Sequence, residues 1–271
     1  MSMESIPRPE KEQPVEPQKH TPERLLKAID ALNKTVVGKV EVFGKENLKE
    51  LKPDENVIIA TSHIEDPDVT LAVSVLGRSL DIAITNQSVH HTFLGEPGVN
   101  IGMRIAGREN FLPISYKKSE GKKVSVFDPA DFDAMKEPMT NGKSLVVAAQ
   151  NPTFTGQLGK GGVGAVYLAQ ITGKRILPFA VDMDKKEGLL KRPDARTHIG
   201  KPFELEHIDG IENLVSLDQK RKEGTLSPEE RQNYKDLLST LKQQSEFVMR
   251  NIAVMLPEEK RGIYREHPET K

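Results

Sequence analysis

Two patterns of apolar residues alternate along the chain. Short apolar runs, which are typical of strands buried on both faces, occur at 57–60, 80–85, 111–114, 145–149 and 176–181. Apolar residues recur at helical spacing at 25–32, 69–76 and 165–171. Residues 36–43 alternate apolar and polar side chains, which predicts one more strand. This succession predicts an α/β fold, in which helices pack on the faces of a sheet.

Capping signals predict where the helices begin and end. Thr21 is expected to cap the first helix, and Gly77 and Gly173 are expected to end the two helices that follow strands. The sequence Ser-Pro-Glu-Glu at 227–230 combines a cap, a first-turn proline and a capping-box glutamate. It predicts a long C-terminal helix over about 228–256. The charged stretch from Asp184 to this helix is expected to be loop, including the region 220–225.

One domain is expected over residues 21–265, because the chain shows no internal repeat and no second unit. Residues 1–20 are rich in Pro, Glu and Lys and contain almost no large apolar residues. They are predicted to form a disordered arm.

Composition excludes several classes of function. The net charge is −1, aromatic residues make up 5% and Trp is absent, so a nucleic-acid partner is not expected. The chain has no Cys, which excludes disulfides, thiolate nucleophiles, Cys-ligated zinc and iron–sulfur clusters. The chain contains no apolar stretch of about 20 residues, so no membrane-spanning helix is expected. The N-terminus is charged and Pro-rich, so no secretory signal is expected and a cytoplasmic location is favoured.

A histidine and an aspartate lie at the junction between the apolar run 57–60 and the predicted helix 69–76. Four residues separate His63 from Asp68. Ligands of α/β sheets bind beyond the carboxyl ends of the strands, which is where this junction lies. An aspartate at a helix start can accept backbone N–H groups and also the ring N–H of a histidine, which stabilises the imidazolium. His63 held in this way can act as a general base toward a hydroxyl.

Other interpretations of this segment stay open. Asp68 can be simply a helix cap, because a His and an Asp at this spacing also occur together by chance. A metal-dependent hydrolase that uses His63, Asp66 and Asp68 is a further alternative, although no other ligands cluster near them. His90 and His91 do not predict a zinc site, because adjacent residues point in different directions and no carboxylate lies at ligand spacing. No metal is therefore expected.

The segment 56–77, NVIIATSHIEDPDVTLAVSVLG, resembles the first motif of the glycerol-phosphate and lysophosphatidate acyltransferases. In that family an apolar strand leads into Asn or Ser followed by His-x-x-x-x-Asp. Residues 37–48 look like the strand and turn before that motif, and 145–183 look like the third and fourth motif region. Residues 253–264 resemble the end of some bacterial members. The resemblance covers roughly residues 22–205, and the order of its segments is its most specific part.

This resemblance implies a mixed, mostly parallel sheet and direct acyl transfer without a covalent acyl-enzyme. It implies that His63 is the general base, that Asp68 orients it, and that a hydroxyl of a lipid-like acceptor attacks an acyl thioester. The donor would be acyl-CoA or acyl-carrier protein, as a co-substrate, and no cofactor is implied. A lipid-like acceptor also favours a peripheral contact at the inner face of the membrane.

The chain departs from the family pattern at the third motif. The family reads Phe-Pro-Glu-Gly-Thr-Arg-Ser after the buried strand, whereas residues 148–154 read Ala-Ala-Gln-Asn-Pro-Thr-Phe. Gln150 replaces the Glu and loses its charge, and Thr153 replaces the Arg that would grip an acceptor phosphate. In the second motif, Phe111 is one residue out of spacing and Arg108 lies in front of it.

Two interpretations follow from these departures. In the first, the acceptor is not a phosphate monoester, or its phosphate is bound by Arg108 or by Lys117, Lys118 or Lys160. In the second, the protein has lost efficient catalysis and binds a lipid or an acyl-carrier protein. The intact His63–Asp68 pair favours the first. The residues expected to bind substrate are Arg108, Gln150, Asn151, Thr153 and Lys160.

Three weaker signals each have a structural and a functional interpretation. Glycines at 159, 161, 162 and 164 permit a tight loop or cradle a cofactor phosphate, but Gly-Lys-Ser/Thr of a P-loop is absent. Basic residues at 117–118 and 122–123 form solvated surface or contact lipid head groups or coenzyme phosphates. The apolar face of the first helix packs on the domain or touches a membrane surface.

Overall fold

Seven strands form the sheet of this computed structural model, in the order β1-β7-β6-β2-β5-β3-β4. The structure describes residues 20–65, 67–85, 111–112, 129–150, 153, 155–184 and 191–266. The strands are β1 (Val40–Phe43), β2 (Ile58–Thr61), β3 (Ile82–Thr85), β4 (Phe111–Leu112), β5 (Ser144–Ala148), β6 (Ile176–Met183) and β7 (Ala195–Ile199). Within these ranges every pairing is parallel except that of β6 with β7. The predicted α/β fold with a mixed, mostly parallel sheet in one domain is confirmed.

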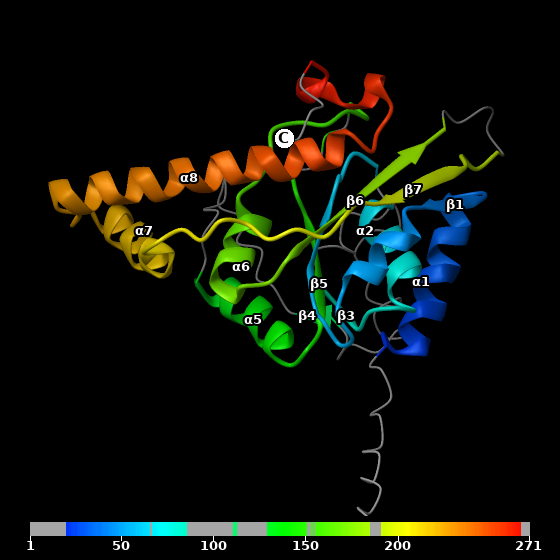
Figure 1. The fold of residues 1–271 in the computed structure, drawn as a ribbon, viewed down its shortest axis with the longest axis horizontal. Coiled ribbons are helices and arrows are strands. Elements are labelled where there is room, and N and C mark those ends of the chain that lie inside the picture. The colour runs from blue at the N-terminus through cyan, green and yellow to red at the C-terminus, as the bar shows by residue number, and fades with distance from the viewer. Residues whose placement is uncertain are drawn as a thin grey trace, which may run out of the picture.

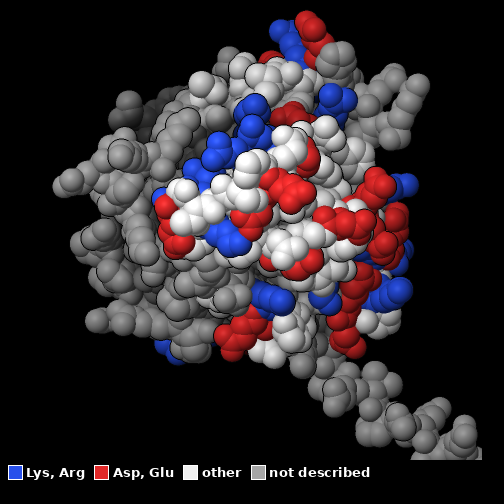
Figure 2. All heavy atoms as spheres, turned by 90° about the vertical axis from the view of Figure 1, so that its left-hand side faces the viewer, with Lys and Arg blue, Asp and Glu red and all other residues white. Residues whose placement is uncertain are grey.

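Helices cover both faces of the sheet (Figure 1). On one face lie α1 (Glu23–Val36) and α2 (Asp68–Leu76), and on the other lie α5 (Pro129–Thr140), α6 (Gly164–Thr172) and α8 (Pro228–Ala253). The shorter α7 (Leu214–Glu223) packs against α8. These two helices project from the sheet, and their outer face carries basic and acidic side chains side by side (Figure 2).

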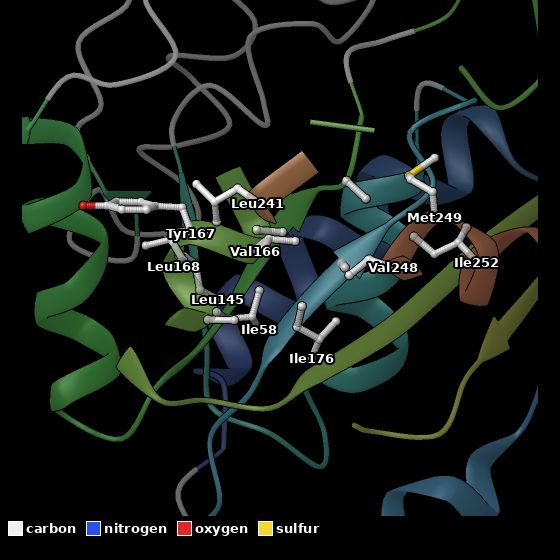
Figure 3. Packing of buried hydrophobic residues seen from close by; sticks show 14 of the residues in the cluster. Ile58, Leu145, Val166, Tyr167, Leu168, Ile176, Leu241, Val248, Met249 and Ile252 are labelled. Carbon is white, nitrogen blue, oxygen red and sulfur yellow. The ribbon is translucent and has the colours of Figure 1, made fainter. Parts of the chain in front are cut away.

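The central strand β2 divides its side chains between two cores, because successive residues of a strand point to opposite faces. Ile58 and Ala60 pack with the α6 and α8 layer, whereas Ile59 and Val57, the residue just before the strand, pack with α1 and α2. All four are fully buried, which explains why this strand has no polar alternation. Figure 3 shows Ile58 among side chains of α6 and α8, including Val166.

The predicted start of α8 is confirmed in its hydrogen bonds. Ser227 Oγ accepts from the backbone N–H of Glu230 at 3.1 Å, and Glu230 Oε2 accepts from the N–H of Ser227 at 2.9 Å. This reciprocal capping box fixes the helix end that lies farthest from the sheet core. Toward its other end, Leu241, Val248 and Ile252 are buried against the sheet (Figure 3).

The first helix differs from the prediction in its cap. Pro22 is the residue that precedes α1, and Thr21 does not cap it. The Thr21 hydroxyl instead donates to Leu80 O at 2.8 Å and accepts from Ile82 N at 2.9 Å, so it ties the helix to the start of β3. The strand predicted at 36–43 begins only at Val40, because α1 continues to Val36.

The apolar face of α1 is buried on the domain, which confirms the structural interpretation of this helix. Leu25, Leu26 and Ile29 are each less than 9% exposed and belong to the core shared with α2. In the part of the chain that the structure describes, no helix combines the length and apolarity needed to cross a bilayer.

The expectation of loop between 184 and 227 was wrong, because β7 and α7 lie there. On β7, buried Ala195, Thr197 and Ile199 alternate with polar Arg196 and His198, so the strand has no continuous apolar run. Helix α7 is charged and buries few apolar residues, and so lacks a clear periodic signal. Helix α5 was also not predicted, and it contains a proline at 138.

Candidate active site

Three parallel strands deliver the candidate site to one edge of the sheet. β2 lies between β5 and β6, and Thr61 at its end pairs with Ala148 and with Phe179. The ladder continues one step farther, where Ser62 N donates to Phe179 O at 3.1 Å and Ala149 N donates to Thr61 O at 2.9 Å. Segments that follow these three strands therefore meet beyond their carboxyl ends, as ligand sites of α/β sheets do.

Asp68, the first residue of α2, is completely buried and binds both neighbours of His63. Its Oδ2 accepts from the Ser62 hydroxyl at 2.8 Å and from the Ile64 backbone N–H at 2.9 Å. The Ser62 oxygen in turn accepts from Val181 N on β6 at 3.3 Å. We call residues 62–65 the His63 loop. The carboxylate of Asp68 thus holds this loop against the start of α2 and the end of β6.

The second oxygen of Asp68, Oδ1, is also buried and has no hydrogen-bond partner among the described residues. The expected hydrogen bond from the His63 ring to this carboxylate is therefore not formed, and Asp68 acts on His63 through the residues on either side of it. Burial raises the pKa of Asp68 to about 7, and the hydrogen bonds from Ser62 and Ile64 oppose that rise. A carboxyl with this pKa changes charge in the physiological range. A nearby imidazolium would favour its ionised form.

His63 is half-buried and has a left-handed backbone, with φ of 53°. This conformation costs an L-residue about 1–2 kcal/mol relative to the ordinary regions, although His tolerates it better than most residues do. It persists here because Asp68 binds the residue on either side and Gln150 Nε2 donates to the His63 carbonyl at 3.4 Å. Such strain is typical of functional sites.

Gln150 joins the His63 loop to the glycine-rich loop at 156–164. It is 2% exposed. Its Oε1 accepts from Gly159 N at 2.8 Å, while its Nε2 donates to the His63 carbonyl and, at 3.2 Å, to Thr153 Oγ1. The Thr153 hydroxyl donates onward to Gln157 O at 2.6 Å. Gln150 and Thr153 therefore bind each other and the backbone around them.

The amides of the glycine-rich loop donate to protein acceptors. Gly159 N bonds to Gln150, Gly162 N donates to Ala149 O at 2.7 Å, and Gly161 N donates to Tyr264 Oη at 3.4 Å. These three amides do not form a phosphate cradle. The structural interpretation of the glycines fits better, because a Cβ on Gly161 would lie 2.4 Å from Ser245 Oγ of α8.

The other predicted substrate-binding residues have different outcomes. Lys160 lies exposed on the glycine-rich loop. Arg108 and Asn151 are outside the described residues, as are Asp66 of the metal alternative, His90, His91 and the lysines at 117, 118, 122 and 123. Within the described ranges, no group of three His, Asp or Glu side chains could hold a metal ion.

Two polar residues at the site were not predicted from the sequence. Ser62 precedes His63, and its small hydroxyl next to the motif could have indicated a contact with Asp68. Lys260 has no such signal. Its ammonium donates to Glu65 Oε1 on the His63 loop at 2.9 Å, although 195 positions separate the two residues.

Comparisons with known proteins give little beyond the fold. No family model matches the chain, and no curated protein matches its sequence. Among solved structures, the chain is similar to the 1-acyl-sn-glycerophosphate acyltransferase PlsC from Thermotoga maritima, at 16% identity and a TM-score of 0.45. The match covers 75% of this chain and 78% of that one. A likeness this remote carries no statement about activity, so function has to be inferred from the site itself.

Proposed function

We propose that this protein is an acyltransferase that moves an acyl group from a thioester donor to a hydroxyl of a lipid-like acceptor. The observation that carries this proposal is the grip of buried Asp68 on both neighbours of His63, at the carboxyl ends of three parallel strands. A structural helix cap does not require a strained histidine beside it, whereas backbone strain of this kind clusters at functional sites.

The chemistry follows from the groups at this edge of the sheet. His63 removes the proton of the acceptor hydroxyl, and Asp68 stabilises the imidazolium that forms. The hydroxyl oxygen attacks the thioester carbonyl, the carbon–sulfur bond breaks, and the leaving thiolate takes the proton back from His63. The protein then needs no nucleophile of its own, in keeping with a chain that has no Cys.

Acceptor binding must differ from the family pattern under this proposal. Gln150 and Thr153 form hydrogen bonds within the protein, so we assign them a role in the geometry of the loops. Lys160 is exposed on the glycine-rich loop and remains a proposed contact of the acceptor. Arg108 and Asn151 remain proposed contacts. We propose acyl-CoA or acyl-carrier protein as donor and a cytoplasmic location. A peripheral membrane contact would not use the apolar face of α1, which is buried.

The test is release of free thiol from palmitoyl-CoA by the purified protein. The acceptors are glycerol 3-phosphate, lysophosphatidate, glycerol and monoacylglycerol, so that phosphorylated and unphosphorylated hydroxyls are compared directly. We expect acceptor-dependent release with wild type. His63→Ala is expected to reduce kcat by about 10²–10⁴-fold without unfolding the protein, because the base is lost.

His207→Ala is the matched control, because His207 is exposed and lies outside the site. It is expected to keep wild-type activity. Equal rates for His63→Ala and wild type would contradict the assignment of the base. Binding of lipid or acyl-carrier protein without turnover, unaffected by Asp68→Asn, would support the alternative of a catalytically weakened binding protein.

A further inference from the structure

The segment 257–265, which follows α8, lies against both loops of the candidate site. Its backbone carbonyls accept from the glycine-rich loop, where Leu158 N donates to Lys260 O at 2.9 Å and Gln157 Nε2 donates to Glu259 O at 3.0 Å. The approach is close. A Cβ added to Gly262, whose φ is 53°, would lie 1.9 Å from the Leu158 carbonyl oxygen.

Lys260 reaches from this segment to the His63 loop. Its Nζ lies 2.9 Å from Glu65 Oε1, 3.0 Å from Asp182 Oδ1 and 2.7 Å from the carbonyl oxygen of Met183. An ammonium has three N–H donors, and three acceptors surround this one. Glu65 is two residues from His63, and Asp182 lies near the end of β6. The lysine therefore bridges the His63 loop and the strand beside it.

The surroundings make this bridge stronger than an exposed ion pair. The side chains of Lys260 and Asp182 are 17% and 3% exposed. Burial acts to lower the pKa of Lys260, but its hydrogen bonds to Glu65 and Asp182 outweigh that effect and raise it. Burial likewise acts to raise the pKa of Asp182, and Lys260 with Arg196 holds that pKa below its ordinary value. Lys260 and Asp182 are therefore both charged at neutral pH.

We propose that Lys260 is a positioning residue, which holds the His63 loop against β6 by bridging Glu65 and Asp182 and so keeps the imidazole aligned for proton transfer. Asp182 retains Arg196 when Lys260 is removed, whereas among the described residues the Glu65 carboxylate pairs with Lys260 alone. The effect of losing Lys260 is therefore expected on the His63 loop. Displacement of a reacting group by about 1 Å can reduce a rate by about 10²-fold.

The first test compares turnover of Lys260→Met, Lys260→Arg and Glu65→Gln, and it rests on the proposed function. Lys260→Met is expected to lower kcat by about tenfold or more with little change in KM, because alignment and not binding is lost. Lys260→Arg keeps the charge and is expected to restore part of the rate. Lys27→Met, which breaks the exposed pair with Glu23 on α1, is the matched control and should leave kcat unchanged.

A double variant tests whether Lys260 acts through Glu65. Combining Lys260→Met with Glu65→Gln is expected to be no worse than Lys260→Met alone, because both changes break the same bridge. The proposal would be overturned if the fold-decreases in kcat of the two single variants multiplied in the double variant. It would also be overturned if Lys260→Met kept the kcat of wild type.

Amide hydrogen exchange gives a readout that does not need turnover. In Lys260→Met, exchange at 62–65 is expected to rise by about tenfold, while exchange at 58–60 in β2 stays unchanged. Unchanged exchange at 62–65 would contradict the positioning role whether or not acyl transfer is found. If wild type transfers no acyl group but exchange at these amides is faster in Lys260→Met, the proposed function is refuted and the bridge is still supported.

Discussion

The two loops that meet at the candidate site are held by opposite kinds of side chain. The His63 loop is held by Asp68, whose carboxylate only accepts hydrogen bonds. Its donors are the Ser62 hydroxyl and the Ile64 backbone N–H. The glycine-rich loop is gathered by Gln150, an amide that accepts from Gly159 and donates to the His63 carbonyl. A negative charge suits Asp68, because its partners are donors. At Gln150 a negative charge would face the His63 carbonyl oxygen.

This difference explains why an amide suits position 150. A glutamate there would place a second carboxylate oxygen against the His63 carbonyl, and the Thr153 hydroxyl already donates to Gln157. An amide satisfies the donor and the acceptor with one side chain. Gln150 therefore belongs to the way in which this protein connects its two loops.

Titration of Asp68 gives the largest effect after loss of the base itself. Because its pKa is about 7, the carboxylate that supports His63 becomes protonated as the pH falls below 7. We expect kcat/KM of wild type to decline by about tenfold per pH unit there, from a plateau above pH 8. The measurement is a pH–rate profile. A profile that stays flat down to pH 5.5 would contradict the role of Asp68.

The same titration has a defined sign in stability. The folded pKa lies above the ordinary value of 3.8, so the folded state binds this proton more tightly than the unfolded state does. Its contribution is fully present below about pH 4 and is lost as the pH rises to about 7. Urea unfolding of wild type and Asp68→Asn should therefore diverge across this window and run parallel above pH 8.

The packing of Gly161 against α8 tests how the glycine-rich loop is held. Gly161→Ala is expected to reduce the free energy of unfolding by about 1–3 kcal/mol, because the new Cβ would lie 2.4 Å from Ser245 Oγ and 2.7 Å from Met249 Cγ. Gly164→Ala is the matched control, since no atom lies within 4 Å of its Cβ position. It is expected to change stability by no more than about 1 kcal/mol. Equal losses in the two variants would argue against packing as the cause.

Gln150→Glu removes the amide donor that connects the two loops. We expect a loss of about 1–3 kcal/mol in stability and a decrease of about tenfold in kcat, because a carboxylate cannot donate to the His63 carbonyl. Gln170→Glu is the control. Gln170 is a buried amide that accepts from Ile208 N and donates to Glu206 O, away from the site. A similar loss of stability with unchanged kcat is expected there, and a parallel loss of kcat would remove the special role of Gln150.

Backbone strain at His63 gives the smallest effect. His63→Gly is expected to be more stable than His63→Ala by about 1 kcal/mol, because glycine adopts a φ of 53° without the steric cost paid by alanine. Both variants are expected to be inactive. Chemical denaturation of the two proteins side by side measures the difference, and equal midpoints would show that the loop relaxes once the imidazole is removed.

Much of the sheet could be predicted from the sequence, because the central strands β2, β5 and β6 are buried on both faces and so appear as apolar runs. Strand β7 and helix α7 were missed for the complementary reason. On β7, Arg196 and His198 alternate with buried residues, and on α7 charged residues dominate, so neither contains an apolar run.

The sequence by itself determined the succession of strands and helices, the capping box at Ser227 and the placement of His63 and Asp68 between a strand and a helix. These are local features, set by neighbours within a few residues. Tertiary structure alone decided that Gln150 bonds to the His63 carbonyl, that Gly161 lies against α8 and that Lys260 bonds to Glu65. Such contacts depend on strand order and register, which join residues far apart in the chain. No local pattern of apolar and polar residues encodes them.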